Sequence, residues 1–117
     1  MRAWRIESTA GIDGLRQADI ALPEPGTGEV RVRLRANAIN YRDLSVISDP
    51  QSRGIPLPRI PNSDGAGEVL AVGPGVTGFA PGDRDAGCFF QNWVDGPCKT
   101  EAMASALGGE IEGVLSE

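Results

Sequence analysis

The sequence predicts a mostly β fold with one or two short helices. Sixteen Gly and nine Pro in 117 residues favour short strands and tight turns over long helices. Residues 30–38 alternate apolar and polar side chains, the period of a strand with one buried face. Residues 40–48 have room for two helical turns, and residues 100–107 predict a second short helix.

Length and composition narrow the class of protein. A chain of 117 residues suits one domain, and its net charge of −5 argues against a nucleic-acid partner, which needs a basic surface. No apolar run approaches the roughly 20 residues of a membrane span, and the charged start MRAWRIE is not a secretory signal. We therefore expect a cytoplasmic protein with no membrane partner. Cys88 and Cys98 fit a reducing compartment, although a disulfide between them stays open.

The first half of the chain predicts three strands and a helix. Residues 2–7 indicate a short strand, residues 15–22 a weaker one, and residues 23–28 a turn. The strand at 30–38 is the clearest, half-buried and antiparallel. Its apolar positions alternate with Arg and Asn; they are Val30, Val32, Leu34, Ala36 and Ala38.

Asn40 is the expected N-cap of a helix over residues 40–48, with Asp43 near the positive end of its dipole. A proline-rich loop follows at 49–62, because Pro56, Pro58 and Pro61 exclude a regular helix there.

The second half predicts two short strands, at 68–72 and 82–87, joined by a glycine turn at 73–78. A second helix is expected at 100–107, stopped by Gly108 and Gly109, and a further strand begins near 114–115. The turn at 73–78 (GPGVTG) matches the dinucleotide fingerprint GxGxxG literally. However, Phe79-Ala80-Pro81 follows where a helix must open, so we interpret it as a hairpin turn.

Four ordered blocks resemble one enzyme family. Residues 62–76 (NSDGAGEVLAVGPGV) match the glycine spacing of the zinc-type alcohol dehydrogenase signature, with Gly67, Gly73 and Val76 in register. Residues 79–84 (FAPGDR) resemble its F-x-x-G-D-R/K block, residues 28–32 (GEVRV) its G-E-V-L-V strand, and residues 40–44 (NYRDL) its C-x-x-D segment. The chain thus resembles the medium-chain dehydrogenases/reductases over nearly its whole length.

This resemblance implies a two-domain enzyme. Residues 1–117 would form the GroES-like N-terminal domain, a partly open β-barrel on the substrate side, truncated before a Rossmann nucleotide-binding domain that this chain lacks. It also implies NADPH or NADH bound mainly by the missing domain, a small-molecule substrate, and a homodimer for the full-length protein. The fragment alone is expected to be inactive. The alternative is a free-standing GroES-like binding or assembly module without catalysis.

Departures from the family pattern point to a subclass. Asn40 stands where zinc enzymes have a ligand Cys, Ser63 where they have a ligand His, and Asp64 where they have Glu. There is no His in the chain, and the two Cys lack CxxC spacing. The sequence therefore resembles the zinc-independent, quinone-oxidoreductase-like branch, which transfers hydride between nicotinamide and a carbonyl, enone or quinone. We expect no metal site.

Five residues are the candidates for the site. Tyr41, Asn40 and Ser63 are the predicted catalytic residues, because a phenol, an amide and a hydroxyl can donate hydrogen bonds to a developing oxyanion. Asn40 and Tyr41 are also predicted to bind the cofactor, while Asp43 and Asp64 orient neighbouring groups. The alternatives stay open: Asn40 and Asp43 as helix caps, Tyr41 as a packed aromatic, and Ser63 and Asp64 as turn formers.

Overall fold

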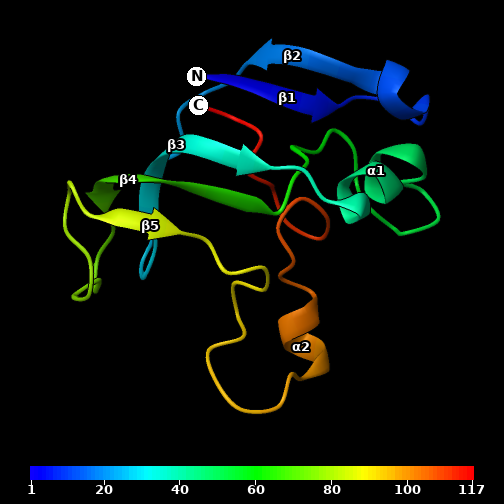
Figure 1. Cartoon of the computed structure of the whole chain (residues 1–117). Helices are drawn as coiled ribbons and strands as arrows, with labels where there is room; N and C mark the ends of the chain where they lie inside the picture. The colour runs from blue at the N-terminus through cyan, green and yellow to red at the C-terminus, as the bar shows by residue number, and fades with distance from the viewer.

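Two separate antiparallel sheets form the fold (Figure 1). The computed structural model describes all of residues 1–117. The expected mostly β class is confirmed, as strands predominate and neither sheet closes into a barrel. In chain order the elements are β1 (Arg2–Ile6), the 3-10 helix η1 (Gly11–Gly14), β2 (Leu15–Asp19), β3 (Val30–Ala38), α1 (Tyr41–Ser48), β4 (Asp64–Val72), β5 (Arg84–Ala86) and α2 (Thr100–Met103).

Strands β3 and β4 make the longest pairing in the molecule. Their register runs from Val30 opposite Val72 to Ala38 opposite Asp64, with two shifts along the way. Strand β4 begins at Asp64, so the predicted start at residue 68 was wrong. The early part is rich in glycine, and at Gly67 the backbone of β3 comes too close to leave space for a Cβ atom. Small residues let the two backbones approach closely. Because glycine has a low strand propensity, propensity alone places the start of β4 too late.

The two faces of the three-stranded sheet differ in character. Val69 is fully buried on the inner face, where it stands opposite Val32. Arg33, Glu68 and Arg84 form a cross-strand row on the outer face. The predicted half-burial of β3 holds for its first part, but Ala36 and Ala38 are exposed because the sheet is open at that end.

The main hydrophobic cluster lies between β1, α1 and the proline-rich loop. Its buried members are Ile6, Val46, Ile47 and Ile55, with Leu15 and Leu57 packed against them. The loop at 49–62 therefore has no helix, as expected, yet it contributes core residues. Helix α1 has eight residues, and no helix of the structure has the length and hydropathy needed to cross a membrane.

Several element ends differ from the sequence-based boundaries. Strand β2 ends at Asp19 rather than 22, and β5 spans Arg84–Ala86 rather than 82–87. Helix α2 covers only Thr100–Met103, since Ala106 and Leu107 instead make β-bridges to Phe90 and Ile111. Tertiary pairing thus wins over helix propensity at residues 104–107. The turn at 73–78 joins β4 to β5, and no helix opens after it.

The expected strand near 114–115 is an extended strap. Its amides bond to the carbonyls of residues 60–62: Gly113 to Ile60 at 2.8 Å, and Val114 to Asn62 at 3.0 Å. The chain then returns to β1 through a bridge between Ala3 and Ser116, which brings the two termini together.

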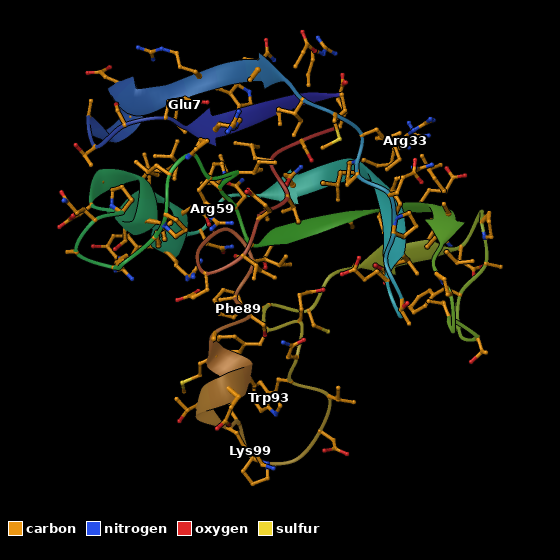
Figure 2. The ribbon with its side chains drawn as sticks, turned by 180° about the vertical axis from the view of Figure 1, so that it is seen from behind. Glu7, Arg33, Arg59, Phe89, Trp93 and Lys99 are labelled. Atoms are coloured by element: carbon orange, nitrogen blue, oxygen red, sulfur yellow. The ribbon has the colours of Figure 1, made fainter.

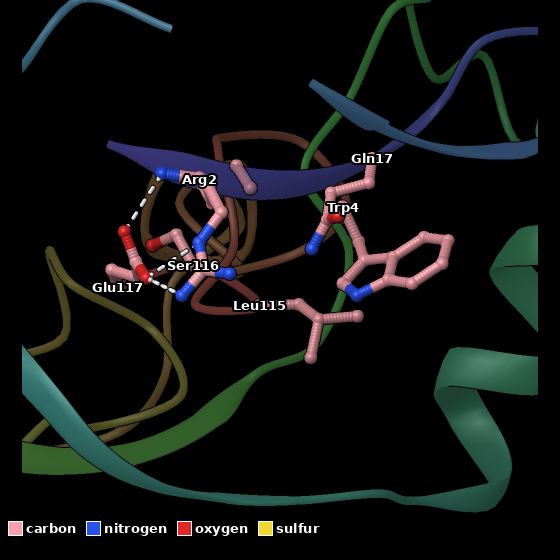
Figure 3. Close-up of a pocket in the computed structure, with 7 residues that line it drawn as sticks. Arg2, Trp4, Gln17, Leu115, Ser116 and Glu117 are labelled. Carbon is pink, nitrogen blue, oxygen red and sulfur yellow. Dashed lines mark hydrogen bonds and ion pairs between the residues drawn. The ribbon is translucent and has the colours of Figure 1, made fainter. Parts of the chain in front are cut away.

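Glu117 closes this return against Arg2 (Figure 3). Its carboxylate accepts hydrogen bonds from the backbone N–H of Arg2 at 3.0 Å and from Nε at 2.8 Å. The hydrogen bond from the Arg2 side chain lowers the pKa of Glu117 and raises the pKa of the guanidinium. Beside the pair lies a small hollow of about 240 Å³, lined by Arg2, Trp4, Gln17 and the strap.

Asp85 is an inner-face carboxylate without a partner. It stands opposite Gly67, which itself pairs with Leu34, so these three residues share a row on the inner face. The residue is half-buried and makes no hydrogen bond or ion pair with its side chain. We expect Asp85→Val to raise the free energy of unfolding by about 1 kcal/mol, because a half-desolvated charge and poor strand propensity are both removed. Denaturant unfolding is the measurement.

The control is Asp19→Val on the exposed strand β2, which reports the strand-propensity gain less the attraction that Asp19 exerts on Arg2 opposite it. If the two variants gain equally, or if Asp85→Val changes stability by less than about 0.5 kcal/mol, Asp85 is as well solvated as a surface residue.

Candidate functional site

The pairing of β3 with β4 places Asn40 beside Asp64. Ala38 pairs with Asp64, so the chain leaving β3 passes the start of β4. The side-chain amide of Asn40 donates from Nδ2 to Oδ2 of Asp64 at 2.7 Å. Because a carboxylate only accepts, the nitrogen of the amide is the atom that faces Asp64. The second hydrogen of Nδ2 has no acceptor within the protein and is free for a ligand.

Asp43 holds the backbone of Asn40 at the start of α1. Its Oδ2 accepts the N–H of Asn40 at 2.7 Å, and its own N–H donates to the carbonyl of Asn40 at 3.0 Å. The residue is 1% exposed, and its Oδ1 is buried without a partner. This arrangement is a capping box, in which the N3 carboxylate of Asp43 reaches back to the N-cap amide. Asp43 therefore caps the helix and also fixes the position of Asn40.

Tyr41 and Ser63 lie in opposite environments. Tyr41 is 86% exposed, and its phenol makes no hydrogen bond within the protein. Ser63 is 2% exposed, directly before Asp64 in the chain. Tyr41 is therefore not a packed aromatic, and a ligand can reach its hydroxyl. Ser63 is buried, so a ligand would reach its hydroxyl only through neighbouring groups. Hydrogen bonds join Asn40, Asp43 and Asp64. Tyr41 and Ser63 are their neighbours in the chain and take no part in these bonds.

Arg42 is a residue that sequence reasoning missed. Its guanidinium donates to the carbonyl of Leu107 at 3.1 Å, pairs with Glu110 at 3.3 Å and lies 4.8 Å from the centre of the Phe89 ring. It thereby ties the first turn of α1 to the segment before the strap. Gly109 leaves space for this guanidinium, since a Cβ atom there would collide with it.

Asn62 was also missed. It is buried, has a φ of 70°, and accepts the strap amide of Val114. Asn is one of the few residues that adopt this left-handed conformation readily. Gly108 packs against its backbone with no space for a side chain. The pair Gly108-Gly109, which the sequence suggested as a helix stop, is therefore a close-packing point around the site.

The donor set does not suit zinc. Catalytic zinc takes three protein ligands, usually imidazole, thiolate or carboxylate, and here the corresponding positions carry Asn40 and Ser63. The one carboxylate among them, Asp64, already accepts the amide of Asn40. No group of three or more His, Cys, Asp or Glu residues is placed to hold a metal ion.

Comparison with known proteins assigns the chain to a family. Residues 26–117 match the alcohol dehydrogenase GroES-like domain. A zinc-type alcohol dehydrogenase-like protein of Schizosaccharomyces pombe is 39% identical over 112 residues, which cover 95% of this chain and 32% of that protein.

Solved structures agree with this assignment. A thermostable alcohol dehydrogenase from Pyrobaculum aerophilum superposes with a TM-score of 0.81 at 28% identity, covering 100% of this chain and 37% of that one. The Escherichia coli quinone oxidoreductase, crystallised with NADPH, superposes with a TM-score of 0.66 at 26% identity, covering 74% and 26%. The chain therefore spans about a third of the length of the relatives it matches.

The capping role of Asp43 predicts a stability effect. We expect Asp43→Ala to lower the free energy of unfolding by about 1–2 kcal/mol, because the N–H of Asn40 loses its acceptor. Asp43→Asn keeps an acceptor oxygen and should lose less. The exposed Asp13 has no side-chain hydrogen bond and serves as the control, with Asp13→Ala expected within about 0.5 kcal/mol of the parent. Equal losses for Asp13→Ala and Asp43→Ala in urea unfolding would contradict the capping role.

Proposed function

Because the chain belongs to the alcohol dehydrogenase GroES-like domain family, we propose that it is the substrate-side part of an NAD(P)-dependent oxidoreductase. The reaction is hydride transfer between a nicotinamide cofactor and a carbonyl, enone or quinone substrate. The observation that carries the proposal is the family match over residues 26–117, together with the hydrogen-bonded group that Asn40 forms with Asp43 and Asp64. Relatives named as dehydrogenases and quinone oxidoreductases support it.

The cofactor belongs mostly to another domain. This chain covers about a third of its relatives, and its own GxGxxG segment is a hairpin turn between β4 and β5. We place the nicotinamide in a cleft between residues 1–117 and a Rossmann domain of the same polypeptide. That domain selects NADPH or NADH, while this chain presents the polar groups at the reacting end.

Asn40 and Tyr41 are suited to the nicotinamide end of such a cofactor. Asn40 offers a free amide hydrogen in a fixed direction, since Asp64 holds the other one and Asp43 holds its backbone. The Tyr41 phenol stands one residue further on and is open to solvent. Ribose hydroxyls and a carboxamide are neutral polar groups that such donors recognise well. The nicotinamide ring supplies the hydride, and the protein supplies orientation.

The substrate oxygen needs a hydrogen-bond donor as it gains negative charge. We assign this task to the phenol of Tyr41, the most accessible donor in the group. Asn40 supplies a second, preorganised donor. Ser63 is buried next to Asp64, so its proposed part is to relay a proton or a hydrogen bond rather than to contact substrate.

Zinc independence is part of the proposal. Asn40 and Ser63 replace the ligand positions of the zinc enzymes, and the hydrogen bond from Asn40 to Asp64 joins residues that would otherwise face a metal. In zinc enzymes the metal polarises the substrate oxygen. Here the neutral donors Asn40 and Tyr41 take over that role.

The zinc proposal has a direct test. Purified protein, dialysed mildly without strong chelators, should contain far less than one zinc ion per chain by elemental analysis. Adding zinc should leave its thermal unfolding midpoint unchanged, since a site with no ligands gains no stability from the metal. Stoichiometric zinc that survives dialysis would overturn this part of the proposal.

The activity proposal needs two proteins. We expect the 117-residue chain alone to show no NADPH or NADH oxidation with small quinones and enones, because it lacks a nucleotide-binding domain. The polypeptide that carries it together with a Rossmann domain should turn over. In that protein Tyr41→Phe should lower kcat about 100-fold through loss of the donor to the oxyanion, and Asn40→Ala should also raise KM for the cofactor.

Phe79→Leu is the control, since Phe79 is also exposed but lies in the turn after β4, and its kinetics should match those of the parent. Turnover by residues 1–117 alone would contradict the proposal that another domain binds most of the cofactor. An inactive two-domain protein across the panel would favour the alternative of a binding or assembly module.

A further inference from the structure

The loop between β5 and α2 contains a second cavity, separate from the site around Asn40. It has a volume of about 550 Å³ and lies away from both sheets, where Figure 2 shows Trp93 beside α2. Mostly apolar side chains line it: Cys88, Phe89, Phe90, Trp93, Val94 and Asp95. Trp93 is 45% exposed and Val94 is 91% exposed, so the cavity opens to solvent. We call it the aromatic-loop pocket.

Two rings form a corner of this pocket. The centres of Phe90 and Trp93 are 6.2 Å apart, with their planes inclined by 56°. Phe89 packs edge-on against Phe90, with the ring centres 4.5 Å apart. The indole Nε1 of Trp93 donates to the carbonyl of Gly96 at 2.9 Å, which fixes the ring in the loop. The corner is therefore built before any ligand arrives, and this lowers the entropic cost of binding.

The lining of the pocket carries one negative charge and no positive one. Asp95 is the only charged residue of the lining, and its carboxylate makes no ion pair or hydrogen bond. No Lys or Arg lines the cavity. The ring cluster already accepts a cation elsewhere, since the guanidinium of Arg42 lies 4.8 Å from the centre of Phe89. The faces of aromatic rings are negative, so rings and carboxylate attract the same sign of charge.

We propose that the aromatic-loop pocket binds a small organic cation of the quaternary ammonium type. Such a headgroup carries a diffuse positive charge on an apolar surface, which suits the faces of Phe90 and Trp93. The carboxylate of Asp95 supplies the counter-charge. A neutral apolar ligand would fill the same corner but would gain no attraction from the exposed, unpaired carboxylate of Asp95. This proposal does not depend on the oxidoreductase function.

Trp93 itself reports binding. The full chain with Trp4→Phe has Trp93 as its only tryptophan, and its fluorescence is titrated with choline and with 3,3-dimethylbutan-1-ol, the neutral molecule of the same shape. We expect saturable quenching by choline, with an affinity at least about fivefold higher than that of the neutral analogue. Equal affinities, or no saturation by about 100 mM choline, would overturn the proposal.

Two further substitutions in the Trp4→Phe protein test the residues that line the pocket. Asp95→Asn should weaken choline binding several-fold while leaving the neutral analogue unchanged, and Phe90→Leu should weaken choline more than the analogue. Asp13→Asn and Phe79→Leu are the matched controls, since both residues are exposed and lie outside the loop.

Circular dichroism establishes that each variant is folded. If Asp95→Asn binds choline as well as the parent, the counter-charge argument fails. A trimethyllysine peptide that binds more than tenfold tighter than choline would assign the pocket to a protein segment instead of a small molecule.

Discussion

The register of β3 on β4 is the constraint on which the rest of the molecule depends. Pairing Ala38 with Asp64 brings two segments far apart in sequence to one point, and Asn40 then reaches Asp64 with its amide. The approach requires Gly67, whose missing side chain lets the backbones come together. A shift of one residue would turn every side chain of the strand to the other face and separate the amide from the carboxylate.

A second set of close backbone contacts supports this pairing from behind. The strap at 113–115 bonds to residues 60–62, which lead directly into Ser63 and Asp64. Glu112 adds two more contacts, an ion pair of 3.3 Å to Arg59 and an accepted hydrogen bond of 2.7 Å from the N–H of Ile60. The segment that carries the candidate site is thus held on one side by β3 and on the other by the end of the chain.

The candidate site and the aromatic-loop pocket meet through Arg42. This side chain begins one residue after Tyr41 and reaches Phe89, at the start of the loop that holds the pocket. It also donates to Leu107 and pairs with Glu110. Arg42 therefore belongs to the first turn of α1 and also contacts Phe89, one of the residues that line the pocket.

The sequence alone determined the fold class, the helix at 40–48 with Asn40 as N-cap, the hairpin at 73–78 and the family resemblance. These features depend on residues that lie close together in the sequence. The signals are the alternation of apolar and polar residues, the prolines, the spacing of glycines and the capping residues. Only the tertiary structure decided that β4 starts at Asp64, that α2 stops at Met103, and that Tyr41 is exposed while Ser63 is buried. It also placed Arg42 and Asn62 in the surroundings of the site. These outcomes depend on contacts between residues tens of positions apart, and neither propensity nor periodicity contains that information.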